Sequence, residues 1–437
     1  MANQDLQKGL IQELGWRGMI QQMTAEDEFK EHLNDGMRVV YCGFDPTADS
    51  LHIGSLVPLL ALKRFQQYGH KPIALVGGST GLIGDPSFKT NERQLNSEDV
   101  VGEWVESLKK QVSQFIDFDC GENSAVVANN LDWTKNVDVL SFLRDVGKHF
   151  SINQMIQKES VKQRIDREGE GISFTEFTYM ILQSYDFAEL NKRFDCTIQI
   201  GGSDQWGNIT GGIDLTRRMN RQQVFGMTLP LVTKSDGTKF GKTESGTIWL
   251  DPKKTSQYAF YQFWINTADD DVYKFLRYFT FLSEQEIVAI EEADKETQGR
   301  PQAQGVLAKE VTKLVHGEAG VEAAMRITQA MFKGTLADLG KSDLQQLAQD
   351  GLPSNELPVD IADKPITALL TDCGMVKVGR EVKDALGRNA VWVNGVAKGN
   401  EDNMKSAEIF SSDNALYGRF FLVKLGKKKN HLFTLAS

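Results

Sequence analysis

Residues 37–55 read MRVVYCGFDPTADSLHIGS, and this stretch decides the fold class. Its first part, Met37 to Phe44, is apolar and β-branched enough to form a buried strand. A polar turn follows, and then a segment with helical spacing from Gly54 to Tyr68. A strand, a turn and a helix in this order open a βαβ unit, which the strand-like residues 72–76 complete.

The alternation of strand-like and helix-like segments continues beyond this unit. Helical stretches separate three further strand-like segments, at residues 124–128, 197–200 and 227–232. We therefore predict an α/β fold class with a Rossmann-like parallel sheet and helices on both of its faces. In such a sheet, ligands bind at the carboxyl ends of the strands.

The length of 437 residues exceeds what one hydrophobic core usually organises, so we expect several domains. Residues 251–350 have helical character and little strand signal, and residues 351–365 contain three prolines and a glycine, as linkers do. The chain then returns to mixed character. We predict an α/β domain at residues 1–250, a helical domain at 251–350, a linker at 351–365 and a small α+β domain at 366–437.

The net charge of −10 is unevenly distributed. Residues 373–437 hold eleven Lys or Arg and six Asp or Glu, a balance of +5, so the rest of the chain carries −15. This asymmetry is typical of a nucleic-acid-binding module attached to an acidic body. A solvated basic tail would explain it equally well on charge alone.

The four cysteines are far apart and form no C-x-x-C pair, which argues against a zinc site or a disulfide framework. No apolar run approaches the length needed to cross a bilayer, and no signal peptide is evident. We therefore expect a cytoplasmic protein without a membrane partner.

The first motif that could take part in catalysis is the turn from Pro46 to Ser55, between the first strand and its helix. His52 and the backbone N–H groups near Gly54 can bind a polyphosphate, because glycine lets a nucleotide approach the backbone. Many histidines at a helix start merely cap it, so this motif is weak evidence by itself.

The second motif is Lys239 to Thr243, KFGKT, in a polar loop. Two lysines around a glycine make a cationic loop that can close on the charge of a leaving pyrophosphate. An exposed basic loop without function is the better explanation for this motif alone. Because the His52 motif lies in the same α/β domain, we prefer the interpretation that this loop binds the leaving pyrophosphate.

A third group of residues shares one helical face. Tyr179, Gln183 and Asp186 are four and three positions apart, and their neighbours are apolar. A buried stripe of hydroxyl, amide and carboxylate requires partners, which a polar ligand or an internal network would supply. We expect Tyr41 and Asp85 to face the same crevice.

A fourth motif, QIGGSDQWGN, covers residues 199–208. Here a strand runs through two glycines into Asp204 and Gln205. An acidic residue at the carboxyl end of a strand suits a ribose hydroxyl. A tight turn would explain the glycines without any ligand.

Taken together, these motifs resemble those of the class I aminoacyl-tRNA synthetases, and within them the bacterial tyrosyl-tRNA synthetases. The similarity runs along essentially the whole chain, through YCGFDPTADSLHIG, LVGGSTGLIGDPS, GISFTEFTYMILQSYD, QIGGSDQWGNI and KFGKT. The segment VGREVKDALGRNAVWVNG resembles the small S4-type RNA-binding domain of that family. The resemblance implies a Rossmann-like catalytic domain, a helical domain on the anticodon side and an S4-like domain.

The resemblance also implies roles in binding the amino acid. Tyr41 and Asp186 would hold the phenolic hydroxyl of a tyrosine substrate. The other residues of the tyrosine site would be Asp85, Tyr179 and Gln183 at the ammonium group and Gln205 near the carboxylate.

For the nucleotide, the resemblance implies that Thr47 and His52 meet the leaving phosphates and that Asp204 binds the ribose. The remaining ATP-site residues would be Asp45, at the amino-acid end, with Gly54, Ser55 and Gly202. Lys239, Lys242 and Thr243 would form the family's second signature, with Lys89 and Arg93 in a further mobile loop. Ser55 stands where the family usually has a second histidine, so we expect a slightly weaker contact to ATP.

The activity implied is that of a tyrosine–tRNA ligase, with L-tyrosine, ATP and tRNA(Tyr) as partners, Mg²⁺ on the ATP phosphates, no protein metal site, and a homodimer. Another nucleotidylyl transferase would explain residues 37–250, but neither the S4-like tail nor the tyrosine-matching pocket. A non-catalytic RNA-binding relative would keep the tail and lose His52, Lys239 or Lys242, which are all present.

Overall fold

The structure is a computed structural model that describes residues 9–83, 97–158, 161–162, 165, 172–238, 240–243, 246–333, 339–358, 361–426 and 429–435. The chain divides into two compact units. The first comprises residues 1–250 and 268–303, and the second comprises residues 251–267 and 304–437.

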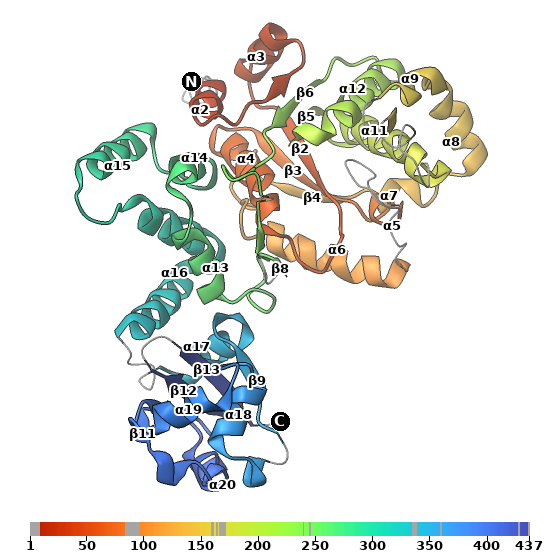
Figure 1. Ribbon diagram of the computed structural model, residues 1–437. Helices are drawn as coiled ribbons and strands as arrows, with labels where there is room; N and C mark the ends of the chain where they lie inside the picture. The colour runs from red at the N-terminus through yellow and green to blue at the C-terminus, as the bar shows by residue number, and fades with distance from the viewer. Residues whose placement is uncertain are drawn as a thin grey trace. The chain divides into compact units, whose positions relative to one another are not determined.

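The first unit is built on a six-stranded sheet with the strand order β1-β6-β5-β2-β3-β4 (Figure 1). The edge strand β1 pairs antiparallel with β6, and all other neighbours are parallel. The strands are β1 Gln22–Met23, β2 Val39–Phe44, β3 Lys71–Val76, β4 Val126–Asn129, β5 Cys196–Gly202 and β6 Phe225–Leu229. The Rossmann-like α/β sheet predicted from the sequence is confirmed.

Helices connect these strands on both faces of the sheet. The chain moves from β2 to β3 and β4 in one direction and to β5 and β6 in the other. Right-handed crossovers therefore place α4 and α6 on one face and α11 and α12 on the opposite face. These helices are α4 Leu56–Gln67, α6 Glu98–Val112, α11 Phe174–Phe194 and α12 Trp206–Asn220. The order reverses between β2 and β5, which is where such sheets bind ligands.

Local sequence explains where the long helix α11 begins and ends. The Ser173 hydroxyl accepts a hydrogen bond from the Glu176 N–H at 3.2 Å, which caps the first turn. The helix ends at Asp195, which has a left-handed backbone with φ of 53°. Phe187 and Leu190 of this helix are fully buried in the core of the unit. The side chains that α11 presents at the carboxyl ends of the strands are thus held by a well-packed element.

Shorter helices complete the first unit. They are α2 Leu10–Trp16, α3 Glu26–Asn34, α5 Thr80–Ile83, α7 Leu131–Thr134, α8 Val139–Asp145, α9 Ile152–Ile156, α14 Asp269–Phe279 and α15 Glu284–Glu296, with the 3₁₀ turns η1 Ile53–Ser55, η2 Gly147–His149 and η3 Ser203–Gln205 and the short hairpin β7 Lys242–Thr243 and β8 Gly246–Thr247.

The division into units differs from the predicted boundaries at 250 and 350. Helices α14 and α15 belong to the first unit, although the sequence analysis assigned them to a separate helical domain. The apolar stripe of α14, with Val272, Phe275, Leu276 and Phe279, is buried. Periodicity in the sequence identifies such a stripe but not the surface against which it packs, so the boundary was wrong there.

The second unit contains a five-stranded sheet with the strand order β11-β10-β12-β13-β9. Its elements are α13 Gln257–Ile265, α16 Ala303–Lys333, α17 Lys341–Gln346, η5 Leu347–Gly351, β9 Ser354–Glu356, η6 Ile361–Asp363, α18 Ile366–Asp372, α19 Gly379–Leu386, β10 Val391–Val393, β11 Val396–Lys398, η7 Asn400–Asp402, α20 Ser406–Ile409, η8 Ser412–Asn414, β12 Phe420–Leu425 and β13 Lys429–Thr434. Helix α16 is interrupted at Gly317, whose φ of 71° is not helical. It therefore consists of two helical parts joined by a kink.

The central strand β12 is buried on both faces of this sheet. Phe420 and Leu422 pack in a cluster with side chains of α13, α16 and α17. Phe421 and Val423 pack on the other face, in a cluster with side chains of α18 and α19. Alternate side chains of a strand point to opposite faces, which is why this segment is apolar throughout.

The structure differs from the predicted linker at residues 351–365. It contains β9, which pairs in parallel with β13, with Ser354 opposite Leu432. Pro353 and Pro358 stand just outside this edge strand, where the missing N–H groups break no internal ladder. In the sequence the prolines indicate an irregular chain, whereas Pro353 and Pro358 flank the edge strand of a sheet.

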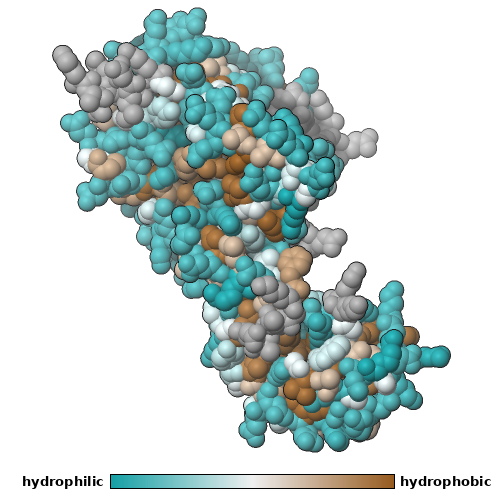
Figure 2. Space-filling model, turned by 90° about the vertical axis from the view of Figure 1, so that its left-hand side faces the viewer, coloured by the Kyte–Doolittle hydropathy of each residue, from teal (hydrophilic) through white to brown (hydrophobic). Residues whose placement is uncertain are grey.

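Hydrophilic side chains predominate around smaller hydrophobic groups on the face drawn in Figure 2. Among the helices that the structure describes, none is both long enough and apolar enough to cross a membrane.

Candidate active site

A cavity of about 640 Å³ lies in the first unit, at the carboxyl ends of β2 and β5. The sheet order reverses between these two strands. The sequence-predicted residues that line the cavity are Tyr41, Asp45, Thr47, His52, Gly54, Ser55, Tyr179, Gln183, Asp186, Gly202, Asp204 and Gln205. Residues that are more than 160 positions apart in the sequence therefore share one cavity, as the prediction required.

Tyr41 of β2 and Asp186 of α11 are each only 1% exposed. Within the part of the chain that the structure describes, the Tyr41 hydroxyl has no hydrogen-bond partner. Burial, and then the charge of Asp186, raise the pKa of Tyr41 well above its ordinary value. A buried hydroxyl without a partner is costly, and a ligand hydroxyl in the cavity would satisfy it.

Two residues absent from the sequence prediction hold the Asp186 carboxylate. Asn130 Nδ2 donates to Asp186 Oδ2 at 3.0 Å, and Trp133 Nε1 donates to Oδ1 at 2.8 Å. Burial raises the pKa of Asp186 to about 7, although these two hydrogen bonds act in the opposite direction. Asn130 directly follows β4, so the rule that functional groups cluster at the carboxyl ends of strands would have found it.

A second carboxylate, Asp45, is fixed by two hydroxyl groups. The Tyr179 hydroxyl donates to Asp45 Oδ2 at 2.6 Å, and Thr80 Oγ1 donates to Oδ1 at 2.7 Å. Thr80 in turn accepts from Asn130 Nδ2 at 3.0 Å, so the carboxylates of Asp45 and Asp186 belong to one network. A Cβ at Gly77 would overlap both Asp45 and Thr80, and glycine is required there. Tyr179 thus contacts a carboxylate directly, a partner that helical spacing did not reveal.

The amide and carboxyl groups after β5 form a chain of hydrogen bonds. Gln183 Nε2 donates to Gln205 Oε1 at 3.3 Å, and Gln205 Nε2 donates to Asp204 Oδ2 at 3.1 Å. Asn208 Nδ2 also donates to Gln205 Oε1, at 3.1 Å. A Cβ at Gly202 would stand 2.5 Å from Asp204 Oδ1. The strand can therefore approach this carboxylate only because it ends in glycine.

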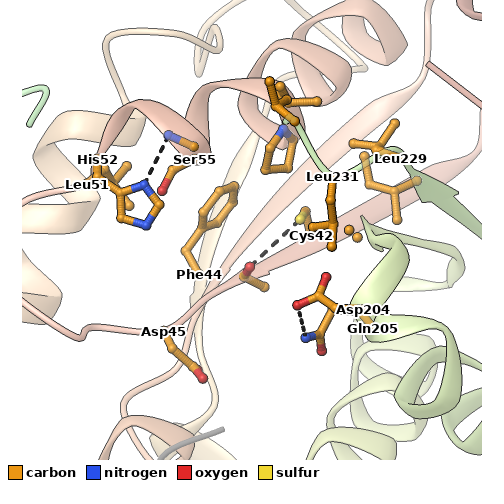
Figure 3. Close-up of a pocket in the computed structure, with 18 of the residues that line it drawn as sticks. Cys42, Phe44, Asp45, Leu51, His52, Ser55, Asp204, Gln205, Leu229 and Leu231 are labelled. Carbon is orange, nitrogen blue, oxygen red and sulfur yellow. Dashed lines mark hydrogen bonds between the residues drawn. The ribbon is translucent and has the colours of Figure 1, made fainter. Parts of the chain in front are cut away.

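Figure 3 shows His52 and Ser55 on one side of the cavity, Asp204 and Gln205 on the other, and Phe44 between them. His52 caps the η1 turn, because its Nδ1 accepts from the Gly54 N–H at 3.0 Å. In the neutral ring Nδ1 is then the acceptor and Nε2 carries the proton. The imidazole is thereby prepared to donate from Nε2.

Two backbone hydrogen bonds join the first signature, Pro46–Ser55, to the residues that follow the second signature, Lys239–Thr243. The Ile53 N–H donates to Ile248 O at 3.0 Å, and the Leu250 N–H donates to Leu51 O at 2.9 Å. Gly241, in the middle of KFGKT, has φ of 77°, and a Cβ there would overlap Ile53. The second signature therefore packs directly on the first.

Several predicted residues cannot be located in this way. Asp85, Lys89, Arg93 and Lys239 lie outside the described residues. For Lys242 and Thr243 the structure describes only the backbone, which forms β7 and pairs with β8.

No cluster of three or more His, Cys, Asp or Glu side chains suited to a metal ion occurs among the described residues.

The family described as tRNA synthetases class I (W and Y) matches residues 33–333 of this chain. A tyrosine–tRNA ligase of Aliivibrio salmonicida is 64% identical over 425 residues, which cover 97% of this chain and 98% of that protein. The tyrosine–tRNA ligase of Escherichia coli is 58% identical over 419 residues, covering 96% and 97%. The chain belongs to the tyrosine–tRNA ligase family of class I tRNA synthetases.

Solved structures of this family agree with the fold. A C-terminally truncated mitochondrial tyrosyl-tRNA synthetase of Aspergillus nidulans aligns with a TM-score of 0.65 and 31% identity, covering 73% of this chain and 93% of that one. The corresponding protein of Coccidioides posadasii aligns with a TM-score of 0.64 and 28% identity, covering 74% and 95%.

Proposed function

We propose that this protein is a tyrosine–tRNA ligase that activates L-tyrosine with ATP and then transfers the tyrosyl group to the 3′ end of tRNA(Tyr). One observation carries this proposal beyond family membership. The cavity ends in a buried tyrosine hydroxyl without a partner among the described residues, and the buried carboxylate of Asp186 lines the same cavity. Such a pair matches the phenolic hydroxyl of tyrosine, which can donate to one group and accept from the other.

Selection against phenylalanine follows from the same pair. A site that bonds a substrate hydroxyl rejects an analogue without it, because buried polar groups then stay unpaired. This argument is already familiar for tyrosyl-tRNA synthetases as a class. Asn130 and Trp133 support its use here, since they hold the Asp186 carboxylate in place from the side of the protein.

At the other end of the amino acid, Asp45, Tyr179, Gln183 and Asp85 would receive the ammonium group, and Gln205 would lie near the carboxylate. The Tyr179 hydroxyl donates to the Asp45 carboxylate, which presents negative charge where an ammonium group would need it. The substrate carboxylate is itself the nucleophile, so the reaction requires no general base from the protein.

In the activation step, this carboxylate attacks the α-phosphorus of ATP and expels pyrophosphate. Catalysis then consists of positioning and of stabilising the growing charge. Thr47, the Nε2–H of His52 and the N–H groups near Ser55 would meet the phosphates, with Asp204 and Gly202 at the ribose. Lys239, Lys242 and Thr243 would approach the leaving group from the second signature, with Lys89 and Arg93 from a further loop. Mg²⁺ would arrive with the ATP phosphates.

The transfer step uses a ribose hydroxyl of the terminal adenosine of the tRNA, for which the class implies the 2′-hydroxyl. We propose that the C-terminal residues 366–437 bind RNA as an S4-like module. In and beside α19, the side chains of Lys377, Arg380, Lys383 and Arg388 are exposed. A row of cations on one small module is typical of binding to a phosphate backbone.

We also propose a homodimer, which exposed apolar side chains of the first unit support. Phe142 of α8 packs edge-on against Tyr185 of α11, with ring centroids 5.8 Å apart. The other apolar residues of α8, Val139, Leu140 and Leu143, remain exposed, Leu140 by 78%. An apolar helix face of this kind calls for a partner surface. Leu140→Glu should shift the mass measured by light scattering from dimer to monomer, whereas Val288→Glu, at an exposed apolar position of α15, should leave it unchanged.

The function itself is tested by charging of a bacterial tRNA(Tyr) transcript with labelled tyrosine. We expect ATP-dependent formation of tyrosyl-tRNA. A non-catalytic RNA-binding relative would bind the transcript and leave it uncharged, and that result would overturn the proposal. A cytoplasmic location remains a prediction from the sequence.

A further inference from the structure

We propose that Asp271 of α14 is a positioning residue for the second signature, Lys239–Thr243. It acts by fixing the turn that precedes Lys239 in the sequence, and it touches no reacting atom. This inference rests on the proposed activation step, because the signature has a role only in that step.

Asp271 holds the base of the loop that precedes the signature. Its carboxylate accepts from the Ser235 N–H at 3.0 and 3.1 Å and from Ser235 Oγ at 3.0 Å. Lys274, one turn further along α14, pairs with Asp271 at 2.9 Å and donates to Thr233 O at 2.9 Å. Asp271 is 2% exposed. Burial alone would raise its pKa, yet the bonds from Ser235 and Lys274 outweigh burial and lower it.

The loop between Thr233 and Lys239 is itself a compact turn. The Gly237 N–H donates to Lys234 O at 3.0 Å, and Gly237 has φ of 77°, which suits glycine. Asp236 Oδ1 accepts from the Thr238 N–H at 2.8 Å and from its hydroxyl at 2.6 Å. A displacement at Ser235 is therefore passed along a stiff turn to the residue before Lys239.

The far side of Lys239 is anchored on the same helix. The Phe240 ring stacks on Phe279 at 5.2 Å and meets Phe275 edge-on at 5.1 Å between ring centroids. Polar bonds at Ser235 and aromatic packing at Phe240 thus fix the chain to α14 on either side of position 239.

Helix α14 is in turn fixed to α4, the helix that follows the first signature. Arg64, near the end of α4, donates from Nη2 to Thr280 O at 2.6 Å, just past the end of α14. Arg17 donates to the same carbonyl at 3.1 Å, and also to Arg277 O at 2.9 Å and Leu282 O at 2.7 Å. Positive charge at the carboxyl end of a helix is favourable. Helix α4 begins directly after the His52 turn, so α14 contacts both the second signature, through Phe240, and the helix that follows the first signature.

These contacts have a consequence for the rate of activation. The cations of the second signature stabilise charge only where they meet the phosphates, and a misplacement of about 1 Å can reduce a rate by as much as 100-fold. None of the proposed tyrosine-site residues in the described part of the chain belongs to this loop, because they lie on β2, α11 and η3 or follow β2. Loss of the Asp271 anchor should therefore affect the chemical step and not tyrosine affinity.

The test is the single-turnover rate constant for tyrosyl-adenylate formation, with the tyrosine dissociation constant and melting temperature of each variant. We expect Asp271→Asn to lower the rate constant on the order of tenfold and Ser235→Ala about threefold, with tyrosine affinity unchanged. The double variant should be no slower than Asp271→Asn, because both changes break the same contact.

Asp294→Asn is the matched control. Asp294 lies on the next helix, α15, and also accepts backbone N–H groups, from Gln302 at 2.7 Å and Ala303 at 3.0 Å, none of them in the loop before Lys239. It should keep the wild-type rate even if it melts earlier. A wild-type rate in Asp271→Asn, or equal losses of rate in Asp271→Asn and Asp294→Asn, would overturn the inference. Absence of adenylate formation in the unmodified protein would instead overturn the proposed function.

Discussion

The two residues to which we assign the choice of tyrosine are polar groups whose burial is energetically unfavourable. The Tyr41 hydroxyl and the Asp186 carboxylate lie in the core side of the cavity, and only the carboxylate has partners among the described residues. An unpaired buried hydroxyl lowers stability, which is consistent with the proposal that Tyr41 binds a ligand.

The substitution Tyr41→Phe separates the effect of this hydroxyl on stability from its effect on specificity. Removal of a hydroxyl that has no described partner should leave the free energy of unfolding unchanged or slightly higher. The preference for tyrosine over phenylalanine, as a ratio of kcat/KM values, should fall on the order of tenfold. Tyr273→Phe is the control, since its hydroxyl donates to Asp294 at 3.1 Å. That variant should lose stability and keep its preference.

The pKa of Asp186 predicts a pH dependence of tyrosine binding. Burial raises this pKa from 3.8 to about 7, so the free protein carries a neutral carboxyl below pH 7 and a carboxylate above it. If the carboxylate is the form that accepts the substrate hydroxyl, the tyrosine dissociation constant should be about tenfold larger at pH 6 than at pH 8. Calorimetry of the unmodified protein and of Asp186→Asn, which should lose this dependence, measures it.

The same shift sets the sign of a stability effect. Between pH 4 and pH 7 the folded protein binds a proton at Asp186 that the unfolded chain has released. Stability from this group therefore falls as the pH rises through that window, the reverse of a carboxylate with a lowered pKa.

At the scale of elements, the sequence predicted what local patterns determine. Residues 37–44 were predicted as a strand and 54–68 as a helix, and the structure has β2 at Val39–Phe44 and α4 at Leu56–Gln67. The helical spacing of Tyr179, Gln183 and Asp186 was likewise sufficient to place them in one cavity. Propensity and periodicity are local, so these inferences required no tertiary information.

Contacts between side chains on different elements were harder to predict from the sequence. Asn130 and Trp133 reach Asp186 from a different strand end, and Asp271 reaches Ser235 from a helix assigned to another domain. Each contact depends on how two distant elements pack, which periodicity does not encode. The resemblance to a family supplied the roles of the motif residues, but it did not extend to these supporting side chains.

The contact between the two signatures predicts different effects for two glycines. Gly241 and Gly237 both have φ of 77°, so alanine is strained at either position. A Cβ at Gly241 would also overlap Ile53, whereas at Gly237 it would meet nothing within 4 Å. Gly241→Ala should therefore slow adenylate formation on the order of tenfold more than Gly237→Ala. Equal rates for the two variants would contradict the role given to this contact.

At the scale of the whole molecule, the uneven charge has a structural counterpart. The net charge of −10 conceals a balance of +5 in residues 373–437, which form most of the strands and helices after β9. The sequence could not settle whether these cations were a solvated tail. In the structure, several of them instead flank a folded sheet with a core on both faces.

This arrangement predicts that the two steps of the reaction can be separated. Arg380→Gln with Arg388→Gln should raise the KM for tRNA in charging about tenfold at low salt, and less at high salt, because phosphate contacts are lost. Pyrophosphate exchange, which needs no tRNA, should be unchanged. Lys341→Gln, an exposed cation of the same unit, serves as the control. Equal losses in exchange and charging would count against an RNA-binding role.

The central claim is that the cavity activates tyrosine and recognises it by its hydroxyl. Amino-acid-dependent ATP–pyrophosphate exchange, with tyrosine, phenylalanine and tryptophan in parallel, tests both parts. We predict exchange with tyrosine and none above background with the other two. Exchange with phenylalanine at a comparable rate would contradict the assignment of Tyr41 and Asp186, and no exchange with any of the three would contradict the enzyme itself.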